Sequence, residues 1–255
     1  MARQQVRVGR LWLDAVTFAE ALDLIESLAR SGRVASVFTP NVDHLVRAER
    51  SEDFRRAHEE ASLSLADGQP VVWASRLLGT PLPEKISGSD LLDPLLDRIA
   101  RAKMRVFLLG GSPGVGEKAA AALRQRGVEV AGLDSRPVDL AAPPDDDLLG
   151  RLRDARPNVV LVAFGAPKQE IWIHRHRDRL PSAVYIGVGG SLDFLAGQIP
   201  RAPRWMSRAG LEWLFRLSRE PRRLARRYLV DDVGFLGILI RTARSPRSER
   251  IRLRA

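Results

Sequence analysis

The chain has 255 residues, no cysteine and a formal net charge of +10 at pH 7. The lack of cysteine excludes disulfide bonds and thiolate metal sites, and it is typical of a cytosolic protein. Residues 1–9 are polar and basic without an apolar core, and no run of about 18 apolar residues follows, so we expect neither a secretory signal nor a membrane span.

Short apolar runs alternate with helical patterns through most of the chain. The predicted strands are residues 34–38, 62–66, 105–109, 128–133, 159–164 and 183–188. The predicted helices are residues 51–60, 90–100, 115–125, 145–155 and 168–179. Strands that alternate with helices of about 10–15 residues indicate βαβ units. The predicted fold class is therefore α/β, with a mostly parallel, Rossmann-like sheet and helices on both faces.

Five of these strands end in glycine or small polar residues. The segments are Thr39-Pro40-Asn41, Asp67-Gly68, Gly110-Gly111, Gly165-Ala166-Pro167 and Gly187-Val188-Gly189-Gly190. In such sheets ligands bind beyond the carboxyl ends of the strands, where glycine allows close approach and a helix N-terminus favours an anion. Several such loops in one series favour a nucleotide or sugar-nucleotide site. For any single loop, the alternative to a ligand site is a turn in which glycine is needed only for its positive φ.

The last segment differs in charge. Residues 201–255 contain 15 arginines and 5 acidic residues, whereas residues 1–200 contain 26 basic and 26 acidic side chains. We predict a helix over 204–219, a break at Pro221 and a second helix over 222–243, with arginines flanking the apolar residues 234–240. An amphipathic helix on an anionic membrane is the favoured interpretation, and a helix packed on the sheet or in an oligomer interface is the alternative. The expected organisation is a core over 1–200, a helical appendage over 201–244 and a disordered basic tail over 245–255.

A transferase that uses a sugar nucleotide needs a base for the acceptor hydroxyl and groups that stabilise the departing diphosphate. Asp67, at a strand end, is placed to be that base, although Asp-Gly is also a common turn. Thr39 and Asn41 would face the same crevice if their strands are neighbours. Gln169 and Glu170 begin a helix and could bind a sugar, although Glu170 could equally be a first-turn charge.

The sequence does not favour a metal site. The acidic runs at 145–147 and 231–232 resemble a helix start and a helix surface, rather than the Asp-x-Asp loop that holds a divalent ion. His44, His174 and His176 lack a plausible set of further ligands and are expected to be surface or capping residues. We therefore expect no metal and no cofactor, with arginine side chains offsetting the diphosphate charge.

Ordered sequence blocks add a family resemblance. They are Thr39-Pro40-Asn41-Val42-Asp43-His44, Asp67-Gly68-Gln69-Pro70, Gly88-Ser89-Asp90-Leu91, Gly165-Ala166-Pro167-Lys168-Gln169-Glu170, Gly189-Gly190-Ser191-Leu192-Asp193, Ala196-Gly197, Arg201-Ala202-Pro203, Glu212-Trp213-Leu214-Phe215-Arg216-Leu217, Glu220-Pro221-Arg222-Arg223 and Arg226-Arg227-Tyr228. From about Val34 to Leu236 the chain closely resembles the WecG/TagA/CpsF family, glycosyltransferase family 26. The resemblance implies a GT-E-like fold with a C-terminal helical appendage. It also implies an inverting, metal-independent enzyme.

The resemblance further implies roles for single residues. Asp67 would be the catalytic base, and Thr39 and Gln169 would contact the transferred sugar. The donor pocket would contain the residues Asn41, Gly110, Gly111, Gly189, Gly190 and Asp193. Arg216, Arg223 and Arg226 would complete the site over the diphosphate when the appendage docks at the membrane. Lys85 stands where relatives carry an arginine. A lysine keeps the positive charge but lacks the planar fork of the guanidinium group.

The implied reaction moves N-acetylmannosamine, its uronate or a related hexose from UDP to a polyprenyl-diphosphate-linked N-acetylglucosamine. Such a step belongs to teichoic acid, capsule or exopolysaccharide synthesis, and it would place the protein in the cytoplasm, peripheral at the inner face of the membrane. The expected partners are the UDP-sugar donor, the lipid-linked acceptor and an anionic membrane surface. The oligomeric state is left open, a homo-oligomer included.

Two other functions are compatible with parts of the sequence. One is a doubly wound nucleotide-cofactor enzyme, an oxidoreductase or methyltransferase; the Gly110–Gly116 turn does not have the G-x-G-x-x-G spacing that favours it. The other is a nucleic-acid-binding module that uses the basic segment. That segment contains a strongly apolar stretch and no recognisable nucleic-acid motif, so no nucleic-acid partner is expected.

Overall fold

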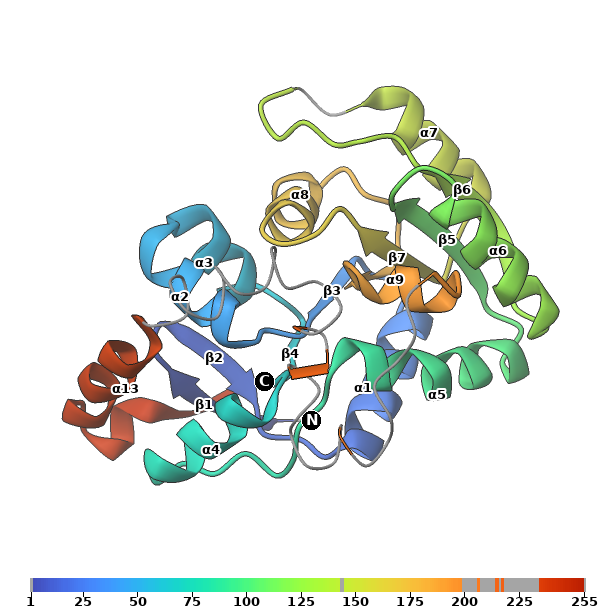
Figure 1. Ribbon diagram of the computed structural model, residues 1–255. Helices are drawn as coiled ribbons and strands as arrows, with labels where there is room; N and C mark the ends of the chain where they lie inside the picture. The colour runs from blue at the N-terminus through green and yellow to red at the C-terminus, as the bar shows by residue number, and fades with distance from the viewer. Residues whose placement is uncertain are drawn as a thin grey trace.

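The computed structural model describes residues 2–142, 145–198, 206, 214, 215, 217 and 234–254. Its centre is a six-stranded sheet with the strand order β4-β3-β8-β7-β5-β6, in which each neighbouring pair is parallel (Figure 1). The strands are β3 (Ala35–Phe38), β4 (Leu63–Ser64), β5 (Arg105–Gly110), β6 (Glu129–Asp134), β7 (Val159–Ala163) and β8 (Val184–Gly187). The sequence predicted all six, because each is a short apolar run between helical segments.

Helices cover both faces of this sheet. One face packs against α1 (Phe18–Arg30), α5 (Gly88–Arg101), α6 (Val115–Gln125) and α9 (Ser191–Leu195). The other face packs against α3 (Glu52–Glu59), α7 (Asp146–Ala155) and α8 (Lys168–His176). Strand side chains alternate between the two cores: in β7, Leu161 joins the first and Val160 the second. The predicted α/β class with helices on both faces is confirmed.

Side-chain caps explain where several helices begin. The Ser51 hydroxyl accepts a hydrogen bond from the Phe54 N–H at 3.3 Å, so α3 begins at the start of the helix that the sequence predicted over 51–60. Asp145 caps α7 in the same way, and Thr17 and Glu20 form a reciprocal capping box at α1. Each cap satisfies N–H groups that have no partner inside the helix, typically stabilising it by about 1 kcal/mol.

A second, antiparallel sheet has the order β2-β1-β9. Its strands are β1 (Arg3–Val8), β2 (Leu11–Asp14) and β9 (Ile251–Arg254). Its apolar face forms a third core with α2 (Val42–Arg50), α4 (Gln69–Leu77) and α13 (Gly234–Arg244). Because β1 pairs with β9, the two ends of the chain lie side by side (Figure 1).

The prediction of a disordered tail over residues 245–255 is wrong for the part that the structure describes. Residues 247–250 form the short helix η2 (Arg247–Arg250), and residues 251–254 form β9. These residues are ordered because β9 pairs with the open edge of β1. Arg252 lies over the Trp12 ring at 4.2 Å and donates to Gln5 Oε1 at 2.8 Å. The basic side chains therefore stack and hydrogen-bond instead of merely facing solvent.

Residues 234–244 of the predicted appendage form α13, which packs on the protein body. Ile238 is buried, and Thr242 Oγ1 accepts a hydrogen bond from the Gly9 N–H at 3.0 Å. A Cβ at Gly9 would lie 2.7 Å from Ile238 Cγ2, so a glycine is needed at that turn. On the outer side, Leu236 is 67% exposed and Ile240 is 48% exposed. Among the described residues no helix is long and apolar enough to cross a membrane.

Candidate active site

The central sheet brings the loops after β3, β4 and β8 to one edge. β3 lies between β4 and β8, so the carboxyl ends of these three strands are neighbours. The chain after β3 continues to α3 on one face of the sheet, whereas the chain after β8 continues to α9 on the opposite face. In α/β sheets, the carboxyl ends of strands whose following helices diverge in this way are the usual ligand site.

Asp67 follows β4 at this edge. Its backbone N–H donates to Pro40 O at 2.9 Å, which keeps it beside the loop that follows β3. Gly68 has a φ of +95° and begins α4, so the chain turns sharply directly after the carboxylate. Asp67 itself is partly exposed. The predicted proximity of Asp67 to the Thr39–Asn41 segment is therefore present.

Thr39 lies close to the first turn of α5, which in turn lies close to the start of α9. A Cβ added at Gly88, in the first turn of α5, would lie 3.1 Å from Thr39 Oγ1 and 3.7 Å from Ser191 Oγ of α9. Just before α5, Lys85 Nζ pairs with Asp90 Oδ2 at 2.7 Å. The Lys85 side chain is 13% exposed. The ends of β3 and β8 and the start of α5 thus converge, with a lysine close to the α5 N-terminus.

The Gly110-Gly111 turn follows β5. Both residues have positive φ values, +88° and +99°, and a Cβ at Gly110 would lie 2.9 Å from Ala163 O. A Cβ at Gly111 would lie 3.1 Å from Leu192 Cδ2 of α9. These glycines are therefore required by packing against β7 and α9. The turn borders the same edge, one strand beyond β7.

Gln169 and Glu170 begin α8 but are almost completely buried, at 5% and 1% exposed. Gln169 Nε2 donates to Glu170 Oε1 at 2.8 Å, and Gln169 Oε1 accepts from the Gly189 N–H at 3.1 Å. Glu170 Oε1 also lies 3.5 Å from His44 Nε2. His44 Nδ1 lies 2.8 Å from Asn41 Oδ1. One network therefore connects the loops that follow β3, β7 and β8.

The buried groups in this network have shifted pKa values. Burial alone would raise the pKa of Glu170, but its contacts with His44, the nearby His58 and Gln169 lower it below the usual range. His58 on α3 packs edge-on against Phe54 and Phe38. Burial lowers the pKa of His58 to about 3, so this imidazole is neutral near pH 7.

The sequence missed the part that His44, His58 and Glu170 play in one cluster. The cap of α2 is Asn41, which accepts from the His44 backbone N–H, and the His44 side chain is buried, so His44 is neither the surface residue nor the capping residue that the sequence predicted. The signal in the sequence was the spacing of Asn41 and His44, because a helix cap and its third residue always lie close together. Nothing local indicated that α8 would bring Glu170 to the same place.

Other predicted residues are distributed as follows. Asp193 lies in α9, after the Gly189-Gly190 turn. Arg216, Arg223 and Arg226 lie outside the described residues. In the described ranges, no three His, Asp or Glu side chains are grouped so that they could hold a metal ion.

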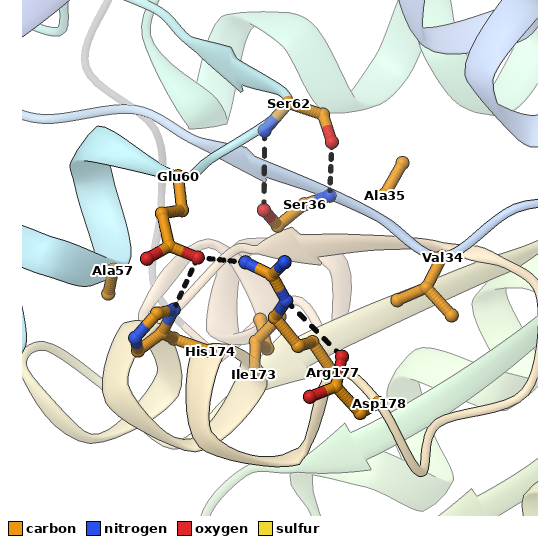
Figure 2. Close-up of a pocket in the computed structure, with 10 residues that line it drawn as sticks. All are labelled: Val34, Ala35, Ser36, Ala57, Glu60, Ser62, Ile173, His174, Arg177 and Asp178. Carbon is orange, nitrogen blue, oxygen red and sulfur yellow. Dashed lines mark hydrogen bonds and ion pairs between the residues drawn. The ribbon is translucent and has the colours of Figure 1, made fainter.

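A separate pocket of about 280 Å³ lies at the amino ends of β3 and β4, at the other edge of the sheet (Figure 2). Ser36 and Ser62 exchange backbone-to-hydroxyl hydrogen bonds there, and Glu60 pairs with both His174 and Arg177. The charged groups of this pocket already pair with one another. It does not include any of the predicted site residues.

Comparisons with known proteins agree on one family. A sequence model described as "Glycosyl transferase WecG/TagA/CpsF family" matches residues 6–249. A protein of Bacillus spizizenii strain W23 is 34% identical over 194 residues, which cover 75% of this chain and 74% of the relative. A protein of Bacillus subtilis strain 168 is 34% identical over 195 residues, with the same coverage. Both relatives are named N-acetylglucosaminyldiphosphoundecaprenol N-acetyl-beta-D-mannosaminyltransferase.

Proposed function

The chain belongs to the WecG/TagA/CpsF family of glycosyl transferases, and we propose that it moves an N-acetylmannosamine-type sugar from UDP to a polyprenyl-diphosphate-linked N-acetylglucosamine. The observation that carries this proposal is the set of relatives with that activity in their names, each matching three quarters of the chain. The nucleotide-cofactor enzyme that the sequence left as an alternative has no support from the family or these relatives. The enzyme is accordingly a hexosyltransferase.

Asp67 is the proposed general base. Its carboxylate takes the proton of the acceptor hydroxyl as that oxygen bonds to the anomeric carbon, and the bond from that carbon to the UDP oxygen breaks with inversion. The electron pair of the broken bond leaves on the β-phosphate of UDP. The position of Asp67 supports this role, since it is partly exposed at the carboxyl edge beside the Thr39–Asn41 loop.

The donor would lie along the loops that meet at this edge. In the proposal Thr39 is nearest the transferred sugar, and Asn41, the two glycine turns and Asp193 surround the nucleotide sugar. Lys85 would face the diphosphate together with the N-terminus of α5. From the family resemblance, we propose that Arg216, Arg223 and Arg226 also offset the charge of the diphosphate. These cations take the part that a metal ion has in other nucleotide-sugar transferases.

The lipid-linked acceptor implies work at a membrane surface, and α13 supports this. Leu236 and Ile240 lie one turn apart on the outer side of the helix, and Arg241 and Arg244 follow in its last turn. Exposed apolar residues next to arginines suit the boundary of an anionic bilayer. We propose that this side of α13 rests on the membrane, with the enzyme peripheral at the inner face.

Asp67→Asn tests the assignment of the base. The variant keeps the shape of the side chain but cannot accept a proton, so we expect turnover to fall at least about a hundredfold. UDP binding, measured by calorimetry, should change by less than about threefold. An Asp178→Asn variant, changed at a carboxylate that is 92% exposed far from this edge, is the matched control.

Near-normal turnover in Asp67→Asn would exclude Asp67 as the base. The wider proposal is tested by a donor screen against a short-chain N-acetylglucosamine-diphospholipid, with products read by mass spectrometry. Transfer of an N-acetylmannosamine-type sugar is expected. Failure of every UDP-hexose to react would contradict the proposed function.

A further inference from the structure

Glu170 is a buried carboxylate at the centre of the network that joins the site loops. It is 1% exposed, and its Oε1 lies 2.8 Å from Gln169 Nε2 and 3.5 Å from His44 Nε2. Burial of a charged carboxylate costs several kcal/mol unless a cation or several hydrogen bonds compensate. The charge of Glu170 therefore needs a partner within this cluster.

Two histidines face Glu170 among the described residues. His58, from α3, is enclosed by Phe38 and Phe54, and its low pKa leaves it neutral. His44, from α2, makes the contact with the carboxylate. Of the other charged groups on α2, Asp43 pairs with Arg47 at 2.8 Å, Glu49 pairs with Arg241 of α13 at 2.8 Å, and Arg50 is exposed. His44 is thus the cation available to Glu170 in this part of the chain.

The hydrogen bonds of His44 give its charge state independently. Asn41 Oδ1 accepts from the His44 backbone N–H at 3.4 Å as the cap of α2, which identifies this atom as the oxygen of the carboxamide. The same oxygen lies 2.8 Å from His44 Nδ1. Both ring nitrogens of His44 therefore face acceptors. A neutral imidazole has one N–H and can satisfy only one of them, whereas an imidazolium satisfies both.

The network fixes three loops of the site relative to one another. Through His44, Glu170 holds Asn41 after β3, and through Gln169 it holds the Gly189 N–H after β8. The fit is tight, because a Cβ at Gly187 would lie 2.8 Å from Gln169 Nε2. Both ends of the Gln169 carboxamide are engaged inside the protein, which favours a positioning role over direct sugar contact.

We propose that His44 and Glu170 form a buried imidazolium–carboxylate pair that positions the donor-binding loops. The inference rests on the proposed function, since it concerns the same site. Loss of either contact of His44 would loosen Asn41 or Glu170. Donor use should therefore decline when the pair is broken.

Glu170→Gln tests the pair with almost no change of shape. A misplaced binding loop typically costs a factor of ten to a hundred, so kcat/KM for the donor should fall at least about tenfold, mostly through KM. The control is Glu60→Gln at the opposite edge, where Glu60 contacts His174 at 3.8 Å. That variant should leave KM unchanged.

A double variant separates positioning from packing. In His44→Asn the new amide N–H can donate to Asn41 Oδ1 in place of Nδ1, and Glu170→Gln removes the charge that would be left unpaired. The double variant should regain most of the lost donor affinity. ¹⁵N NMR of the wild-type ring, assigned with His44→Asn, should show both nitrogens protonated near neutral pH.

Two results would contradict the proposal of an imidazolium–carboxylate pair. One is a neutral His44 ring near pH 7. The other is an active Glu170→Gln enzyme that loses only thermal stability and keeps the wild-type KM. A wild-type protein that neither binds UDP nor transfers sugar would contradict the proposed function instead. The NMR result is independent of transfer activity, so the two failures are distinguishable.

Discussion

Lys85 occupies a position where the family resemblance leads one to expect arginine. Its side chain is mostly buried and pairs with Asp90 at 2.7 Å. A lysine supplies the positive charge as a single point, whereas an arginine binds a diphosphate with a two-pronged fork. For donor binding, the positive charge at position 85 should therefore matter more than the shape of the side chain.

Substitutions at Lys85 can test this. Lys85→Arg should keep donor KM within about threefold, and Lys85→Met should raise it roughly tenfold, because one charge-assisted contact to phosphate is lost. Asp90→Asn is the matched control, since it breaks the same ion pair without removing the cation. Steady-state kinetics with varied UDP-sugar measure the effect. An unchanged KM in Lys85→Met would remove Lys85 from the donor site.

Asp134 contributes to stability in a pH-dependent way. Burial would raise the pKa of this carboxyl, but hydrogen bonds from Arg136 and the charge of Arg151 lower it below the usual value. A lowered folded-state pKa stabilises the protein above the unfolded-state pKa, and this stabilisation is lost as the pH falls through the folded-state pKa. The relevant window is therefore acidic, from about pH 4 downwards.

Asp134→Asn should lower the free energy of unfolding by about 2 kcal/mol at pH 7, because buried hydrogen bonds to charged partners are weakened. The difference from wild type should shrink as the pH falls below about 4, where the native carboxyl also becomes protonated. Urea unfolding at a series of pH values measures this. A difference that stays constant from pH 7 to pH 3 would contradict the pKa assignment.

Residue roles were predictable from the sequence to different degrees. Asp67 and Thr39 could be placed together because parallel neighbouring strands end at the same edge. The pairing of His44 with Glu170 could not be predicted, because it depends on how α2 and α8 pack in three dimensions. Glu170 at a helix start resembled an ordinary first-turn charge, and its burial is set by the loops around it.

At the scale of elements, the βαβ series was predictable and the small sheet was not. The strands of the large sheet are local apolar runs, and their helices carry caps that can be recognised, such as Ser51. β1 has four polar residues out of six, β2 is only four residues long, and β9 resembles a basic tail until its partner is known. The contact between Gln5 and Arg252 spans 247 residues, so no local pattern indicates it.

Removal of residues 246–255 tests the role of β9. The deletion takes away the backbone hydrogen bonds to β1 and the Arg252–Trp12 contact. We expect a loss of about 2 kcal/mol, which lowers Tm by roughly 4–8 °C in a domain of this size. Leu253→Ala, at a side chain that is 76% exposed, is the control and should leave Tm unchanged. An unchanged Tm in the deletion variant would mean that β9 does not support the fold.

At the scale of the whole molecule, charge is separated along the chain. Residues 1–200 are neutral overall, and residues 201–255 have a net charge of +10. An anionic surface would attract the arginine-rich residues 201–255 more than the rest of the chain, and the attraction should weaken as salt screens it. The apolar contacts of α13 should be much less sensitive to salt.

Vesicle flotation can separate the two contributions. Leu236→Glu/Ile240→Glu should reduce binding to anionic vesicles roughly tenfold or more, since two exposed apolar contacts are lost. Lys118→Glu is the matched control, because it changes the net charge by the same amount at an exposed position on α6. Equal loss in both variants would show that charge alone drives binding. If both variants bind vesicles as well as the wild type does, the membrane contact lies elsewhere on the protein.

The pairing of β1 with β9 has a consequence for biosynthesis. β9, the second neighbour of β1, is made 247 positions after it, counted between Gln5 and Arg252. Until β9 is made, the nascent chain has an open strand edge, which Arg3 and Arg7 protect because charged edges resist pairing with other chains. The small sheet can close only after α13 has also emerged. Its closure is therefore a late step of folding, after all six strands of the large sheet have been made.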